Sequence, residues 1–113
     1  MNDMVDPHQA IDFMIKHADK YAEARAHRIY VEEMRKTLKA ELCKDALSQG
    51  FEAVNAQERE AYGHPTYKKH LEAIREAVAK EEQLRWMLIA AQARIDVWRS
   101  QEASNRTIDR LTL

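Results

Sequence analysis

Only four residues of the kind that interrupts helices occur in this 113-residue chain: Pro7, Gly50, Gly63 and Pro65. Glycine and proline are the strongest local interrupters of regular structure, so their scarcity predicts long, continuous elements. Alanine, glutamate, lysine, arginine, leucine and glutamine are plentiful, and these residues lose little rotamer freedom in a helix. No stretch has the pattern of a strand. The sequence therefore predicts an all-α protein.

The positions of the interrupters predict one domain, residues 1–113, built as an antiparallel hairpin of two long amphipathic helices. We expect the first helix over residues 6–49 and a connection containing a short helix over residues 50–64. The second long helix is expected over residues 65–106, with a C-terminal tail at residues 107–113. Two long helices of similar length that are joined by a short connection favour antiparallel packing.

Capping patterns support these boundaries. Asp6, followed by a proline and then by a glutamine three residues after the cap, is typical of a helix start. Gly50 is typical of a helix C-terminus. Asn55 and Glu58 have the spacing of a second capping box, which predicts a short helix from Ala56 to Tyr62.

Apolar residues recur at steps of three and four along both long segments, which is the period of a helix. On the first they are Ile11, Ile15, Ala18, Ala22 and Ile29, then Val31, Met34, Leu38, Leu42 and Ala46. On the second they are Tyr67, Leu71, Ile74 and Val78, then Leu84, Leu88, Ala91, Ile95 and Trp98. Glu81 interrupts the second series, so we expect the coiled-coil register to slip there.

The second long helix carries another apolar line, formed by Trp86, Ala90, Ala93 and Val97. A helix that is apolar on most sides is usually buried on most sides. Because one hairpin partner covers only one face, we interpret these four residues as an oligomer interface and expect a homo-oligomer. The alternative is a monomer in which the short middle helix covers the second line.

The sequence lacks the motifs that carry catalysis or metal binding. Glu23 and His27 lie one helical turn apart, but there is no Glu-x-x-His pair of the di-iron kind. There is also no Cys-x-x-Cys, no glycine-rich phosphate loop and no nucleophile elbow. We expect Cys43 to be a buried apolar residue, the alternative being a reactive thiol. The prediction is a protein with no catalytic residues, metal, cofactor or small-molecule substrate; a metal-dependent enzyme is the remaining alternative.

The expected location of the chain and its net charge further restrict which functions are possible. No segment resembles a signal peptide or a membrane span, so we expect no membrane association and a cytoplasmic location, which is the host cytoplasm if a phage encodes the chain. The formal net charge of −1 gives no overall positive field of the kind that binds nucleic acid indiscriminately. Only local basic patches remain as candidate nucleic-acid sites.

Two groups of basic residues are such candidates. The first helix carries Arg28, Arg35 and Lys39, and the second carries Arg85, Arg99 and Arg106. Cationic side chains along one helix side can bind successive phosphates of a single strand. The alternative is that these charges flank a coiled coil, keeping it soluble and selecting its partner.

Several short segments resemble the phage recombination mediators of the UvsY type. They are Tyr21-Ala22-Glu23-Ala24-Arg25, Lys39-Ala40-Glu41-Leu42, and Ala90-Ala91-Gln92-Ala93-Arg94-Ile95 continuing through Trp98-Arg99-Ser100. Glu41 stands where that family has a basic residue. The resemblance implies a helical ring that binds single-stranded DNA and helps to load a RecA-like recombinase.

Two functions follow from these patterns. The first is an accessory protein of DNA recombination that binds single-stranded DNA as an oligomer and has a RecA-like recombinase as partner. The second is a structural or adaptor protein that binds another protein through its coiled-coil seams and has no nucleic-acid role.

Overall fold

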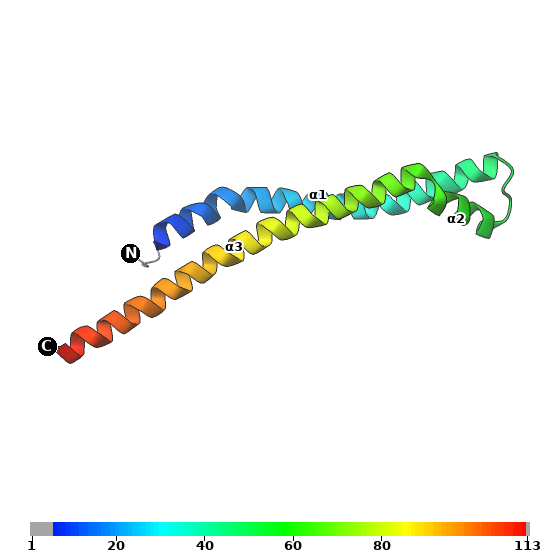
Figure 1. Cartoon of the computed structure of the whole chain (residues 1–113). Helices are drawn as coiled ribbons and strands as arrows, with labels where there is room; N and C mark the ends of the chain where they lie inside the picture. Colours follow the sequence, from blue (N-terminus) through cyan, green and yellow to red (C-terminus); the bar gives the residue numbers. More distant parts are fainter. Residues whose placement is uncertain (1–5, 113) are drawn as a thin grey trace. The chain divides into compact units, whose positions relative to one another are not determined.

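The computed structural model describes residues 6–112 and places three helices among them (Figure 1). These are α1 (Pro7–Ser48), α2 (Val54–Gly63) and α3 (Pro65–Thr112), with 42, 10 and 48 residues. The described residues contain no strand. The predicted all-α class, with two long helices and a short connecting helix, is confirmed.

The chain divides into two compact units, each containing part of α1 and part of α3. The loop unit comprises Glu23–Glu81 and includes all of α2. The terminal unit comprises, among the described residues, 6–22 and 82–112. Within each unit the segments of α1 and α3 run antiparallel (Figure 1).

Capping hydrogen bonds at both ends of α1 explain where the helix begins and ends. The Asp6 side chain accepts hydrogen bonds from the backbone N–H of His8 at 2.9 Å and of Gln9 at 3.4 Å, as an N-cap residue does. At the other end Gly50 has a φ of 102°. The Phe51 N–H donates to the Ala46 carbonyl at 3.0 Å, and the Gly50 N–H donates to the Leu47 carbonyl at 3.1 Å. These two bonds form a Schellman motif, which satisfies carbonyls that the helix leaves unpaired.

Two predicted boundaries are wrong. The short helix begins at Val54, and the residue before it, Ala53, makes no side-chain capping hydrogen bond. The Asn55–Glu58 capping box therefore does not form, because Asn55 already lies inside α2. The second long helix does not end at residue 106 but continues to Thr112, since no glycine or proline follows Pro65 to stop it.

A small apolar cluster holds the loop unit together. Leu42 of α1, the fully buried Ala61 of α2 and Tyr67 of α3 form its centre, and Leu38 and Cys43 pack against it. Cys43 is half-buried, which fits the predicted apolar role. α2 thus lies against both long helices where the chain reverses, and the absence of a side chain beyond Cβ at residue 61 lets the three helices approach closely.

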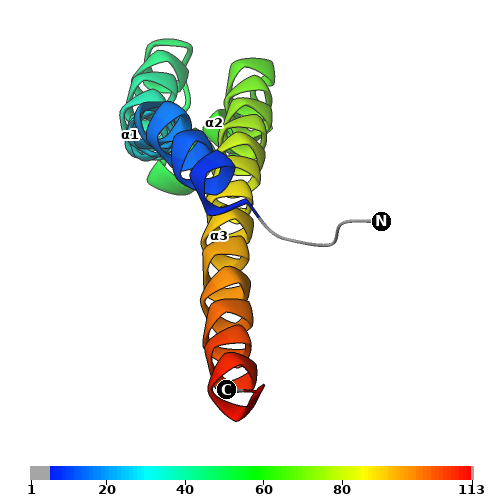
Figure 2. The ribbon, with the colours of Figure 1, turned by 90° about the vertical axis from the view of Figure 1, so that its left-hand side faces the viewer.

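The terminal unit pairs the beginning of α1 with the middle of α3. Ala10 and Phe13 line the same hollow as Met87 and Ala91, and Ala10 and Ala91 are both buried. Beyond this contact α3 continues past the first residues of α1 (Figures 1 and 2). Residues 103–112 are all exposed, so the last three turns of α3 have no packing partner among the described residues.

The predicted seam on the first half of α1 is displaced by about one residue. Ile15 is 70% exposed, and Ile11 and Ile29 are also exposed. The buried positions are instead Ala10, Ala24 and Val31, with half-buried Phe13, Met14, His17, Tyr21 and Arg28 between them. Small side chains occupy the contact because they let two helices approach closely, whereas the isoleucines face outward.

The seam on α3 does not slip at Glu81, contrary to the prediction. Buried and half-buried residues repeat at steps of three and four without a break: His70, Ile74, Ala77, Glu81, Leu84, Leu88, Ala91, Ile95 and Trp98. Glu81 itself is only 6% exposed. A carboxylate occupies this core position because a cation reaches it from α1, as described below.

Candidate association surface

The surface of α3 that points away from its buried seam is the candidate functional site. We define the outer face as Trp86, Ala90, Ala93, Val97, Ser100, Ser104, Ile108 and Leu111, all of which are exposed. At about 100° per residue these positions lie roughly opposite Leu84, Leu88, Ala91 and Ile95. All four residues predicted to form the oligomer interface therefore lie together on one uncovered face.

The large side chains of the outer face sit at its two ends. Trp86 is 59% exposed at one end and Leu111 is 81% exposed at the other, with Val97 at 47% between them. Alanine and serine fill the remaining central positions. The residues just beside the face are also apolar, because Met87 and Ile89 are exposed as well. One helix side thus exposes a continuous row of apolar and small side chains.

The short middle helix α2 and the outer face belong to different compact units. The buried residue of α2, Ala61, packs with Leu42 and Tyr67, while Trp86 and Val97 stay exposed. The alternative in which the middle helix buries the second apolar line therefore stays a prediction.

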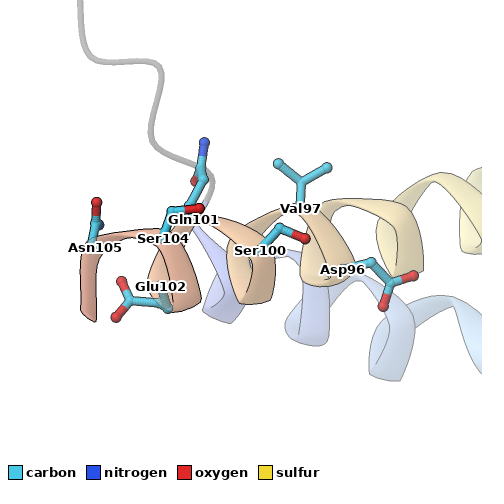
Figure 3. Close-up of a pocket in the computed structure, with 7 residues that line it drawn as sticks. All are labelled: Asp96, Val97, Ser100, Gln101, Glu102, Ser104 and Asn105. Atoms are coloured by element: carbon cyan, nitrogen blue, oxygen red, sulfur yellow. The ribbon is translucent and has the colours of Figure 1, made fainter. Parts of the chain in front are cut away.

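A surface hollow lies over the middle of the outer face (Figure 3). Its described lining residues all come from α3: Asp96, Val97, Ser100, Gln101, Glu102, Ser104 and Asn105. Val97, Gln101 and Asn105 point to one side of the helix, whereas Asp96 and Glu102 point to the other (Figure 3). Because these polar groups do not converge, the hollow lacks the arrangement that fixes a small ligand in a pocket.

Arg28, predicted as a DNA contact, is used inside the loop unit. Its guanidinium Nε donates to Oε2 of Glu81, and its Nη2 donates to Glu81 Oε1 at 3.2 Å. Nη1 also donates to Glu32 at 2.9 Å. These carboxylates raise the pKa of Arg28 above its ordinary value, and the hydrogen bond that Arg28 donates to Glu81 is the largest cause. The arginine links α1 to α3, and its charge is already paired with two carboxylates of the loop unit.

Lys39 and Arg85 also have acidic neighbours. Lys39 Nζ lies 3.5 Å from a Glu58 oxygen and 4.9 Å from the centre of the Tyr62 ring. A hydrogen bond to the Tyr62 hydroxyl, followed by the charge of Glu58, raises the pKa of Lys39. Arg85 donates to Glu82 at 2.9 Å and lies 5.0 Å from the centre of the Trp86 ring. Both cations therefore support local structure.

The other three predicted DNA contacts, Arg35, Arg99 and Arg106, are exposed. Arg99 lies 4.0 Å from Asp96 in an exposed pair one turn apart, a geometry that contributes little to stability. Arg35 is in the loop unit, whereas Arg99 and Arg106 are in the terminal unit. The structure thus places Arg99 and Arg106 on one side of α3. Arg28, Lys39 and Arg85 instead pair with acidic side chains.

Sequence reasoning did not assign Glu81 or His70 a role. The His70 imidazole Nε2 donates to the Val31 carbonyl in the adjacent helix, and Glu81 pairs with Arg28 in the same interface. Both residues lie on the heptad positions that continue the Leu84–Trp98 series towards the N-terminus of α3. Extending that strict spacing backwards is the signal that identifies them.

The histidines provide no metal centre within residues 6–112. No group of three or more histidine, cysteine, aspartate or glutamate side chains is placed there to hold an ion. His17 Nδ1 donates to the Phe13 carbonyl at 2.9 Å and its ring stacks on Phe13. His64 Nδ1 accepts a hydrogen bond from the Thr66 N–H at 3.0 Å. These histidines serve local helix contacts.

Comparison with known proteins adds no family. No family model matches the chain, and no curated protein or solved structure gives a match. The resemblance to UvsY-type mediators therefore stays a prediction. Among the described helices, none has a stretch apolar and long enough to cross a membrane.

Proposed function

We propose that this chain is a non-enzymatic helical assembly protein, which acts by binding other helices through the outer face of α3. The observation that carries the proposal is the exposure of Trp86, Val97 and Leu111 along one side of a single helix. Contiguous exposed apolar surface on a folded protein typically marks an interaction site. Helix-to-helix association requires nothing beyond such a face and suitable flanking charges.

The exposed last turns of α3 support the same proposal. An isolated helix of ten residues is marginal in water, and its stability comes from tertiary packing of an apolar face. Residues 103–112 lack such packing among the described residues, yet they continue the outer face through Ile108 and Leu111. A second helix lying on this face supplies the missing contacts.

Light scattering coupled to size-exclusion chromatography over a concentration series tests the proposal. We expect the wild-type chain to form an oligomer. Val97→Glu, which places a carboxylate in the middle of the outer face, is expected to weaken association at least tenfold. Asn105→Glu is the matched control because it adds the same charge to the same exposed segment about 80° around the helix from Val97, and it is expected to associate normally. Equal behaviour of the two variants, or a monomeric wild type that also binds no protein partner, contradicts the proposal.

Binding of single-stranded DNA is a second candidate. The observation in its favour is that Arg99 and Arg106 are exposed on one side of α3. An oligomer presents this pair of arginines once in every subunit. Repetition of a weak site in an oligomer multiplies its effect through avidity. Loading of a RecA-like recombinase rests on the resemblance to UvsY-type mediators alone, and it enters only after DNA binding has been found.

Fluorescence anisotropy with a labelled single-stranded oligonucleotide tests this candidate. Affinity should fall as salt rises, with a logarithmic slope of about −0.7 for each phosphate contacted. The double substitution Arg99→Glu and Arg106→Glu should abolish binding at low salt. Arg75→Glu, which changes an exposed arginine of the loop unit, is the control. An oligomer that ignores DNA at low salt leaves the protein-binding function alone.

A further inference from the structure

The distribution of side chain sizes along the outer face restricts what can cover it. The bulky residues Trp86 and Leu111 stand at its ends, and small residues such as Ala93 and Ser104 lie between them. Trp86 and Leu111 are separated by about 38 Å along the helix at 1.5 Å per residue. A partner helix must therefore carry apolar side chains at both ends of a segment of this length.

A second copy of α3 in the opposite direction meets this requirement. With Trp86 opposite Leu111 of the second copy, Ala93 lies opposite Ser104 and Val97 opposite Ser100, since these positions follow one heptad pattern. The flanking apolar residue Met87 then meets Ile108. This register covers the large apolar side chains that α3 exposes from Trp86 to Leu111 in both copies.

Charges beside the outer face are compatible with the same register. In antiparallel coiled coils, flanking positions of one kind face each other across the pair. Arg94 then faces Gln101 of the second copy, Asp96 faces Ala103, and Arg110 faces Ile89, so no like charges oppose each other. A parallel pair places Trp86 on Trp86 and Leu111 on Leu111, and it aligns the two helix dipoles in the same direction, which is unfavourable.

We infer that the outer face of α3 pairs with the outer face of a second copy in antiparallel orientation, with Ala93 opposite Ser104. This inference rests on the proposed function, for which it names the partner and the register. A face about 38 Å long on a helix about 10 Å wide covers roughly 400 Å² on each copy. That area is below the size of standard stable interfaces. The pair should therefore dissociate on dilution.

Disulfide cross-linking tests orientation and register together, in a chain whose own cysteine is replaced by Cys43→Ser. We expect the double substitution Ala93→Cys and Ser104→Cys to give a covalent dimer on oxidation. Each single substitution should give no covalent dimer, because the two identical cysteines of an antiparallel pair are then about 16 Å apart along the axis. Disulfides require Cα atoms within about 7 Å. The same distance prevents a bridge between residues 93 and 104 of one copy.

The outcomes separate this inference from the proposed function. Cross-linking of either single variant indicates a parallel pair and overturns the inference. An oligomer that cross-links in none of the three variants uses another face or register, which also overturns the inference but leaves association in place. A chain that stays monomeric at every concentration and binds no protein partner overturns both. Cross-linking confined to the double variant, and lost when Val97→Glu is added, supports both.

Discussion

Replacing Glu81 with leucine tests whether the ion pair inside the α1–α3 interface stabilises the fold. Glu81 is 6% exposed and lies in an otherwise apolar seam between Ala77 and Leu84. Burying a leucine side chain contributes about 1.5–3 kcal/mol relative to leaving it exposed, and nearly all of that burial is available at this position. A buried ion pair gives little net stability, since desolvation offsets the attraction of its charges.

The surroundings of Arg28 determine how much of the stability gained by burying a leucine is retained. After Glu81→Leu, the Arg28 guanidinium still has Glu32 at 2.9 Å and its side chain is 24% exposed, so the cation keeps both a partner and water. We therefore expect Glu81→Leu to raise the free energy of unfolding by about 1–2 kcal/mol. The exposed Glu76 provides the control, and Glu76→Leu is expected to change stability by less than about 0.5 kcal/mol.

Guanidinium unfolding followed by far-ultraviolet circular dichroism measures both variants at one protein concentration, because association shifts apparent stability. If Glu81→Leu lowers the unfolding free energy by more than about 1 kcal/mol, the ion pair stabilises the fold and the reasoning fails. Arg28→Met provides a second check, since it leaves the buried carboxylate without its cation. We expect Arg28→Met to lower the free energy of unfolding, in contrast to Glu81→Leu.

Five further substitutions, at four positions, test the local structure by chemical unfolding. Gly50→Ala should destabilise by about 1–2 kcal/mol because Gly50 has a φ of 102°. Gly63→Ala, at a helical glycine with free space around its Cβ position, should instead stabilise by up to about 1 kcal/mol; equal effects of the two changes contradict the C-cap assignment. Leu42→Ala removes the centre of the loop-unit cluster and should cost about 2–4 kcal/mol, whereas a cost below about 1 kcal/mol would exclude that packing. Asp6→Ala should cost about 1 kcal/mol and Asp6→Asn much less, since asparagine also caps.

The boundaries of α1 were predictable from sequence because their signals are local. Asp6 caps the helix through its own neighbouring N–H groups, and Gly50 adopts the backbone conformation that other residues avoid. The start of α2 was not predictable from the Asn55–Glu58 spacing, because the helix begins before Asn55. Glu58 instead lies near Lys39 of α1, a contact that depends on the fold.

The seams were predicted only where the largest apolar residues are the buried ones. On α3 the series from Leu84 to Trp98 is as expected. On α1, choosing the isoleucines placed the seam on the wrong side, because Ala10 and Ala24 form the close contact. The four residues of the expected oligomer interface are exposed, and their role as an interface stays a prediction. The role of Arg28 was missed because its partner, Glu81, lies 53 residues away.

The exposed final turns of α3 have a consequence for how tightly the chain binds. A helix segment without tertiary support exchanges between helix and coil, so association of residues 103–112 includes the entropic cost of ordering them. The affinity of this segment therefore depends on how far residues 103–112 are already helical before binding, as well as on the contacts that they make. The substitution Asn105→Ala, at an exposed position outside the outer face, raises helix propensity and should strengthen helix association through the outer face without adding a contact.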